Sequence, residues 1–209
     1  MSRQSPPLFR RLTYCPRLEL LEELTLLSFL PPVNYGVGDL PTAVAVGDFD
    51  GDGAPDLATA NLHDVSVLLN NGDGTFRSAG AYVTGNRPYA VVAGDFNGDG
   101  NLDLAVANGG STGDDTVSVL LGNGDGTFQA PVNYAVDANP KGLAVADLNG
   151  DGNLDLVLAM HLKGFTALLG DGKGHFTQRW DKGLDFLEPG KGADESAAFS
   201  SKTLAIVNW

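Results

Sequence analysis

The run Asp95-Phe96-Asn97-Gly98-Asp99-Gly100-Asn101-Leu102-Asp103-Leu104 occurs in three copies along this chain of 209 residues. The other two copies begin at Asp48 and at Asp147. Each copy has Asp or Asn at loop positions 1, 3, 5 and 9, and Gly at positions 4 and 6. Side-chain oxygens at alternate positions of a tight loop are the ligands that Ca²⁺ prefers in proteins. The copies start 47 and 52 residues apart, so the loop belongs to a repeated structural unit.

The segments around each loop predict four short β-strands per repeat. An alternating apolar stretch precedes the loop, two apolar runs follow it, and a glycine-rich turn then leads to a Phe. Asn-Gly and Asp-Gly in that turn favour a hairpin, because they tolerate positive φ. The strands are expected at 42–46, 57–60 and 65–69, at 89–93, 104–107 and 117–121, and at 142–146, 156–159 and 165–169, with fourth strands starting at Phe76, Phe128 and Phe176.

Four short strands in about 50 residues are typical of one blade of a β-propeller. The chain is therefore expected to be all-β, with three blades of four antiparallel strands at 31–83, 84–134 and 135–180. A closed propeller has about four to eight blades, so a partial or open propeller is predicted. Its open blade edges invite pairing with another chain, and oligomerisation is one way to cover them. Residues 181–209 lack a fourth loop and are expected to form a degenerate tail.

The three loops supply candidate Ca²⁺ ligands, for about three ions in all. Position 7 would contribute its backbone carbonyl and the other positions their side chains. The candidates in loop 1 are Asp48, Asp50, Asp52, Ala54 and Asp56. Those in loop 2 are Asp95, Asn97, Asp99, Asn101 and Asp103, and those in loop 3 are Asp147, Asn149, Asp151, Asn153 and Asp155. Loop 1 has four carboxylates against three in the others, so the tightest binding is expected there.

The loops differ from an EF-hand, which needs a Glu at position 12. Here that position holds Thr59, Val106 and Leu158. The expected role of the ion is structural, because a fully ligated ion has no free position for a substrate. An Asp- and Gly-rich hairpin loop that binds no metal is the alternative interpretation.

Residues 32–180 resemble the FG-GAP/VCBS repeats, the blades of integrin α-subunit propellers and of many bacterial secreted proteins. The sequence segments that carry the resemblance are Val46-Gly47-Asp48-Phe49-Asp50-Gly51-Asp52-Gly53 and Val92-Ala93-Gly94-Asp95-Phe96-Asn97-Gly98-Asp99-Gly100. The resemblance implies Ca²⁺ in the loop between the first two strands of each blade. It also implies an extracellular or cell-surface role in adhesion, carbohydrate binding or other recognition.

Residues 1–30 form a separate segment with four arginines followed by a leucine-rich stretch. Three glutamates interrupt that stretch, which favours a short amphipathic helix over a secretory signal. The part 16–28 also resembles an N-terminal motif of large surface or secreted proteins of planctomycete bacteria, with Leu24 where that motif usually has Arg. This resemblance implies export.

Composition narrows the range of functions. The net charge of −13 argues against binding of nucleic acid or of anionic membranes. The single cysteine, Cys15, excludes an intrachain disulfide, and no apolar stretch is long enough for a transmembrane helix. Isolated histidines, with no nucleophile motif, indicate that the chain is not an enzyme.

These observations leave three hypotheses for function. The first is a calcium-binding extracellular module for protein interaction or adhesion. The second is a lectin-like carbohydrate-binding module that uses tyrosines such as Tyr35, Tyr82 and Tyr134, although their recurrence in register favours packing between blades. The third is a non-catalytic part of a larger secreted enzyme.

Overall fold

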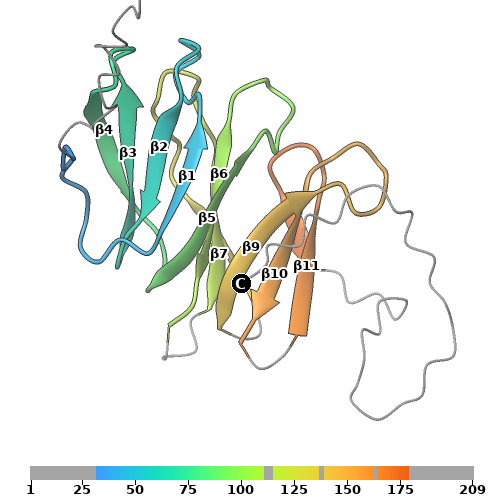
Figure 1. Cartoon of the computed structure of the whole chain (residues 1–209). Coiled ribbons are helices and arrows are strands. Elements are labelled where there is room, and N and C mark those ends of the chain that lie inside the picture. Colours follow the sequence, from blue (N-terminus) through green and yellow to red (C-terminus); the bar gives the residue numbers. More distant parts are fainter. Residues whose placement is uncertain (1–31, 111–114, 137–138, 162–163, 179–209) are drawn as a thin grey trace, which may run out of the picture. The chain divides into compact units, whose positions relative to one another are not determined.

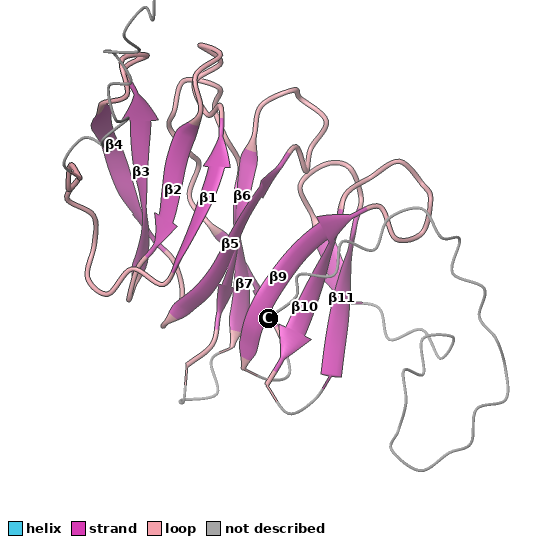
Figure 2. Ribbon diagram, viewed as in Figure 1, coloured by secondary structure: helices cyan, strands magenta, loops and turns pink. Residues whose placement is uncertain are grey.

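The computed structural model describes residues 32–110, 115–136, 139–161 and 164–178 (Figure 1). These residues form twelve β-strands and no helix (Figure 2). All twelve strands belong to one compact unit, Tyr35–Trp209. Blade 1 contains β1 (Ala43–Gly47), β2 (Asp56–Ala60), β3 (Asp64–Asn70) and β4 (Phe76–Val83); blade 2 contains β5 (Pro88–Gly94), β6 (Asp103–Asn108), β7 (Thr116–Leu120) and β8 (Val132–Ala135); blade 3 contains β9 (Pro140–Ala146), β10 (Asp155–Met160), β11 (Gly164–Gly170) and β12 (Phe176–Gln178).

The predicted fold class is confirmed. Each blade is a separate four-stranded antiparallel sheet whose strands are hydrogen-bonded in chain order. The first strands of successive blades are neighbours, β1 beside β5 and β5 beside β9 (Figure 1). The described residues form an open array of three propeller-type blades that does not close into a ring.

Two hydrophobic clusters join the blades face to face. The first packs blade 1 residues such as Val65 and Val67 against Leu104 and Val106 of blade 2, all with no exposed surface. The second packs Val117 and Val119 of blade 2 against a set of blade 3 residues that includes Leu156, Leu158 and Leu168. Because strand side chains alternate between faces, blade 2 uses one face for blade 1 and the other for blade 3.

Aromatic rings repeat at each junction between blades. Tyr82 at the end of β4 packs edge-on against Phe128 of blade 2, with ring centroids 5.6 Å apart. Tyr134 of β8 packs in the same way against Phe176 of blade 3, at 5.8 Å. Such edge-to-face pairs contribute about 0.5–1.5 kcal/mol beyond burial. The interpretation of these tyrosines as packing residues is therefore supported.

The hairpin turn of each following blade fits into the preceding blade. The Gly126 N–H donates to the Phe49 carbonyl over 2.9 Å, and the Gly174 N–H donates to the Phe96 carbonyl over 3.0 Å. A Cβ atom on Gly126 would lie 2.4 Å from a methyl carbon of Leu69. Gly126 also has a φ of +83°, so the turn requires glycine both for its conformation and for the close approach.

The fourth strand of blade 2 differs from the prediction. It was expected to start at Phe128, but β8 begins at Val132, and Phe128 forms only an isolated bridge with Gly122. The physical reason is Pro131, which has no N–H to donate to a ladder. In blade 1, which has no proline there, β4 runs unbroken from Phe76 and accommodates the extra residue as a bulge opposite Val67 and Leu68.

Several predictions concern residues outside the described part of the chain. They are the amphipathic or export segment at 1–30 and the tail at 181–209. Within the described residues, no helix is long and apolar enough to cross a membrane.

Candidate metal-binding loops

The first aspartate of each loop organises the backbone around it. The carboxylate of Asp48 accepts hydrogen bonds from the N–H groups of Gly51, at 2.8 Å, and Gly53, at 2.9 Å. Asp95 and Asp147 accept the equivalent pairs in loops 2 and 3. Gly51 and Gly53 have φ values of +73° and +86°, which L side chains rarely adopt. The repeated D-x-[DN]-G-D-G sequence therefore builds the same turn three times.

Loop 1 brings three carboxylates together. Ligand oxygens of Asp48, Asp50 and Asp56 all lie within 4.8 Å of one another. Among the described residues, no such group of three acidic side chains occurs in loops 2 and 3, where Asn replaces Asp at position 3. Asp52 lies outside the group, and its side chain accepts the Ala54 N–H at 2.7 Å.

The last aspartate of each loop has a structural role that the sequence reasoning missed. Asp56, Asp103 and Asp155 are completely buried. Asp103 accepts the N–H of Phe96 within the loop and the N–H of Gly122 beyond β7, both at 2.8 Å. Asp56 and Asp155 make the same pair of bonds in their own blades. This carboxylate therefore ties the loop to the end of the third strand, a partner 14 to 19 residues away.

Burial raises the pKa of the Asp103 and Asp155 carboxyls, and their two backbone N–H donors oppose that rise. Neighbouring carboxylates of the same loop raise the pKa further, Asp99 and Asp95 for Asp103, and Asp151 and Asp147 for Asp155. A cation bound among these groups would favour their ionised forms.

Position 3 distinguishes loop 1 from the other two loops. The pKa of Asp50 is raised, first by desolvation and then by the charges of Asp56 and Asp52. Arg77 of β4 partly offsets this effect, with its guanidinium 3.2 Å from the Asp50 carboxylate. In loop 2 the Asn97 amide instead donates to Asp99 at 2.9 Å, and Asn149 donates to Asp151 in loop 3. Hydrogen bonds, first from the backbone of Asn101 or Asn153 and then from these amides, lower the pKa of Asp99 and of Asp151.

The residues present fit a hard divalent cation. All their side-chain donors are carboxylate or amide oxygens, and no nitrogen or sulfur ligand occurs in the three loops. In loop 1 the charge of the neighbouring Asp56 adds to the rise in the pKa of Asp50, and a divalent ion bound among the three carboxylates would oppose that rise. The assignment of the individual ligands, including the position 7 carbonyls, stays a prediction.

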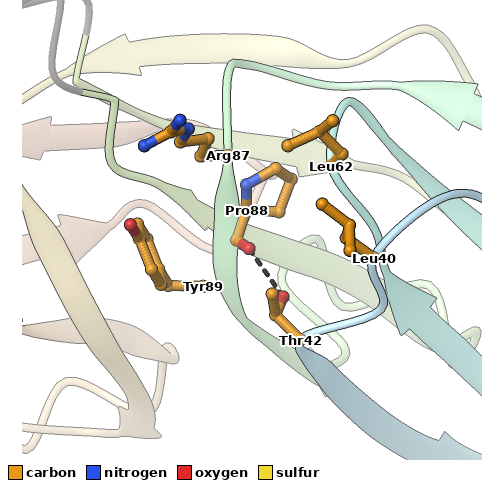
Figure 3. A pocket seen from close by; sticks show the side chains of 6 residues that line it. All are labelled: Leu40, Thr42, Leu62, Arg87, Pro88 and Tyr89. Atoms are coloured by element: carbon orange, nitrogen blue, oxygen red, sulfur yellow. Dashed lines mark hydrogen bonds between the residues drawn. The ribbon is translucent and has the colours of Figure 1, made fainter.

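A shallow hollow lies at the opposite end of blades 1 and 2 from the loops (Figure 3). Leu40, Leu62, Arg87 and Tyr89 line it, and the Thr42 hydroxyl donates to the Pro88 carbonyl across it at 2.6 Å. Its volume of about 170 Å³ is below the roughly 300–1,000 Å³ of typical small-molecule pockets. The ammonium of Lys141 lies 3.1 Å from the centroid of the Tyr89 ring.

Solved structures similar to the chain come from a fungus and from bacteria. A lectin of Agrocybe aegerita, solved in a study of its recognition of non-reducing terminal N-acetylglucosamine, is 28% identical with a TM-score of 0.45 over 64% of this chain. A protein from Lactobacillus plantarum is 17% identical with a TM-score of 0.46 over 66%, and the Photorhabdus luminescens Tc holotoxin pore is 21% identical with a TM-score of 0.43 over 69%. The alignments cover 36%, 40% and 7% of those proteins, respectively. No significantly similar sequence is found among curated proteins.

The sequence matches the family of FG-GAP-like repeats in two overlapping stretches, residues 48–106 and 95–158. Together these stretches cover more than half of the chain, and each of them begins at the first aspartate of a loop. They include the repeated D-x-[DN]-G-D-G turns and most of the strands described above. The chain therefore belongs to the FG-GAP-like repeat family.

Proposed function

We propose that this chain is a calcium-stabilised, extracellular or cell-surface module that binds a protein partner and has no catalytic role of its own. The observation that carries the proposal is the convergence of Asp48, Asp50 and Asp56 in loop 1. The family membership and the open array of blades support a role in interaction.

Calcium binding would act on folding stability. Loop 1 would hold an ion through Asp48, Asp50 and Asp56, and loops 2 and 3 would use Asp95, Asn97 and Asp103, and Asp147, Asn149 and Asp155. When bound, the ion supplies positive charge that neutralises the carboxylates. Millimolar calcium outside cells suffices for sites with Kd of roughly 10⁻⁴–10⁻³ M, which is the basis for the proposed location.

Each loop also contacts the following blade, so a bound ion would stabilise more than its own turn. The backbone between Asp48 and Asp50 accepts the hydrogen bond from Gly126 of blade 2. The Phe49 ring packs against Phe128 of blade 2, with centroids 5.6 Å apart. Fixing loop 1 therefore fixes part of the junction between blades 1 and 2.

The test is thermal unfolding at several calcium concentrations and with a chelator. Only the folded loops form the sites, so the Tm should rise with calcium concentration by mass action. Asp50→Asn should reduce that rise, whereas Asp39→Asn, which removes the same charge from an exposed residue outside the loops, should leave it unchanged. A Tm that does not respond to calcium would contradict the proposal and favour loops held by hydrogen bonds alone.

Carbohydrate binding is the second candidate, and the hollow in Figure 3 is the place to test it. Tyr35, Tyr82 and Tyr134 are already packed against phenylalanines, which leaves Tyr89 as the ring beside a hollow. A sugar stacking on Tyr89 would have to displace Lys141 from the ring. Binding on a glycan array that is lost in Tyr89→Ala would support this function, and no binding to any glycan would exclude it.

A further inference from the structure

A four-residue sequence from the outer strand of blade 2 occurs a second time, ahead of blade 1. Pro131-Val132-Asn133-Tyr134 leads into β8 and forms most of it. The identical sequence Pro32-Val33-Asn34-Tyr35 precedes β1, and the structure assigns no strand to residues 32–37. The chain thus carries the sequence of an additional fourth strand.

Tyr35 already makes the contact of a residue at the end of a fourth strand. Its ring packs edge-on against Phe76 of blade 1, with centroids 5.3 Å apart. This contact repeats the pairs Tyr82–Phe128 and Tyr134–Phe176, in which the tyrosine belongs to the outer strand of the preceding blade. By this equivalence, Tyr35 has the place of the tyrosine near the end of the outer strand of a blade that would precede blade 1.

Blade 3 offers a matching gap. In blade 2, residues Thr116 to Val119 of β7 pair with Ala135 to Val132 of β8. The equivalent half of β11 is Gly164–Ala167, and no described strand pairs with it on that side, because β12 pairs only with Leu168, Leu169 and Gly170. Backbone N–H and C=O groups on a strand edge with no partner among the described residues can accept an added strand.

The two outer faces of the array also match each other. Val65 and Val117 face the next blade and are completely buried, whereas their blade 3 equivalent Phe165 is 67% exposed. Val91 faces the preceding blade and is 6% exposed, whereas its blade 1 equivalent Val44 is 56% exposed. Val46, two residues further along β1, is 60% exposed. Blade 3 therefore presents the apolar surface that blade 1 is built to contact.

We propose that two copies of this chain associate head to tail, blade 3 of one copy packing against blade 1 of the other. Pro32–Tyr35 of the second copy then pairs with Gly164–Ala167 of the first. Within one copy, blade 2 lies between β11 and Phe76, so Tyr35 cannot hold its place on blade 1 while its own strand reaches blade 3. Two copies give six blades, within the range of about four to eight that closes a propeller.

This interface is heterologous, because different surfaces of the two copies meet, and the two-copy ring contains it twice. The proposal does not rest on metal binding, since the contacts that carry it are apolar side chains and backbone hydrogen bonds. The two proposals can therefore fail independently, one through the calcium response of the Tm and the other through the mass of the particle.

The first test is sedimentation of the full chain with saturating calcium over a range of protein concentrations. We expect a species of twice the chain mass, and we expect Val46→Asp and Phe165→Asp each to convert it to the single chain. Both side chains are exposed in the isolated copy, so these changes leave its fold intact. Val132→Asp is the matched control, because Val132 is 51% exposed on β8 of blade 2, and blade 2 presents neither outer face of the array.

Mixing the two disruptive variants distinguishes head-to-tail packing from a symmetric contact. A mixture of Val46→Asp and Phe165→Asp retains one unaltered interface per pair and should recover a two-copy species. If Phe165→Asp alone still forms pairs, blade 1 contacts itself, and the proposal is wrong. A single-chain mass at every concentration also overturns it, and would mean that other parts of the same chain, or other blades, cover these faces.

The second test is a disulfide between copies. The register Ser118–Asn133 in blade 2 predicts that Thr166 of one copy faces Asn34 of the other. Two variants, Thr166→Cys and Asn34→Cys, each with Cys15→Ser, should form a mixed disulfide when oxidised together. Ser66→Cys replaces Thr166→Cys as the control, because Ser66 already faces Ala81 of β4. Equal crosslinking of both cysteines to Asn34→Cys would refute the strand pairing.

Discussion

Loops 1 and 2 have the same backbone turn, but different groups offset the clustered negative charge in each. In loop 2 the Asn97 amide donates to Asp99, so the loop satisfies part of its charge with its own hydrogen bonds. In loop 1 Asp50 occupies the same position, and its carboxylate accepts hydrogen bonds from the Asp52 N–H within the loop and from Arg77 outside it. The pKa of Asp50 is raised while that of Asp99 is lowered. Replacement of one amide nitrogen by a carboxylate oxygen thus removes an internal hydrogen bond from the turn, and the proposed cation would stabilise the resulting loop more.

The largest expected effect concerns what the two loops have in common. Asp103→Ala leaves the N–H groups of Phe96 and Gly122 buried without an acceptor. At about 1–3 kcal/mol for each buried unsatisfied group, the free energy of unfolding should fall by roughly 2–6 kcal/mol. Urea unfolding with chelator present measures this loss without any contribution from metal. A loss below about 1 kcal/mol would show that the tie to the third strand is unimportant.

A reciprocal exchange tests whether the residue at position 3 determines the expected difference in calcium affinity between loops 1 and 2. Asp50→Asn gives loop 1 the composition of loop 2, and Asn97→Asp does the reverse. Because ligand charge tunes calcium affinity, we expect the affinity of the altered loop to change about tenfold, downward in the first variant and upward in the second. Isothermal titration calorimetry resolves both changes. Equal affinities in the two variants and the unaltered protein would mean that position 3 does not bind the ion.

Arg77 should have opposite effects with and without calcium. Its side chain is 57% exposed, so removing the ion pair in Arg77→Gln should cost no more than about 1 kcal/mol in chelator. Blade 2 has Gln129 at the equivalent position, which makes glutamine the natural replacement. An ion held by loop 1 as proposed would compete with Arg77 for the Asp50 carboxylate, so the same variant should bind calcium more tightly. Weaker binding would indicate that Arg77 orders the ligands rather than competing with the ion.

The smallest effect is the dependence of each loop on pH in the absence of metal. The folded-state pKa of Asp50 is raised, so its contribution to stability is present below the ordinary value of 3.8 and is lost as pH rises through the raised value. Asp99 has a lowered pKa, so its contribution is present above 3.8 and is lost as pH falls through the lowered value. Carboxyl NMR titration in chelator should find Asp50 protonating before Asp99 as pH falls. Protonation of Asp99 before Asp50 would contradict the opposite pKa shifts of these two carboxyls.

The sequence predicted the features that depend on local spacing. The D-x-[DN]-G-D-G turns close through hydrogen bonds between residues two to five positions apart, so the residue types alone specify them. The alternation of apolar residues likewise specified the strands, and the glycine turns specified the hairpins. These rules gave the all-β fold and the three blades.

The features that the sequence did not predict depend on distant partners or on a single substitution. The pairing of Asp50 with Arg77 joins residues 27 apart, and the tie between Asp103 and Gly122 joins residues 19 apart. Asp occurs at position 9 in all three loops. This pattern is expected both for a metal ligand and for a buried hydrogen-bond acceptor, so it could not distinguish the two roles. The effect of Pro131 could have been recognised beforehand, because a proline inside an expected strand cannot donate to the ladder and shortens the strand.

The junction between blades has a consequence for how such an array evolves. The hydrogen bond between blades has its acceptor in the loop of one repeat and its donor in the glycine turn of the next. The acceptor is the carbonyl of Phe49 or Phe96, and the donor is the N–H of Gly126 or Gly174. A Cβ atom on Gly74, the equivalent residue of blade 1, would have no atom within 4 Å, whereas one on Gly126 would meet Leu69. Duplication of one gene segment therefore adds a blade that can form this contact with both of its neighbours. Deletion of a segment brings together two blades that can also form it. Arrays of this kind can change length by recombination alone, before any point mutation adapts the new contact.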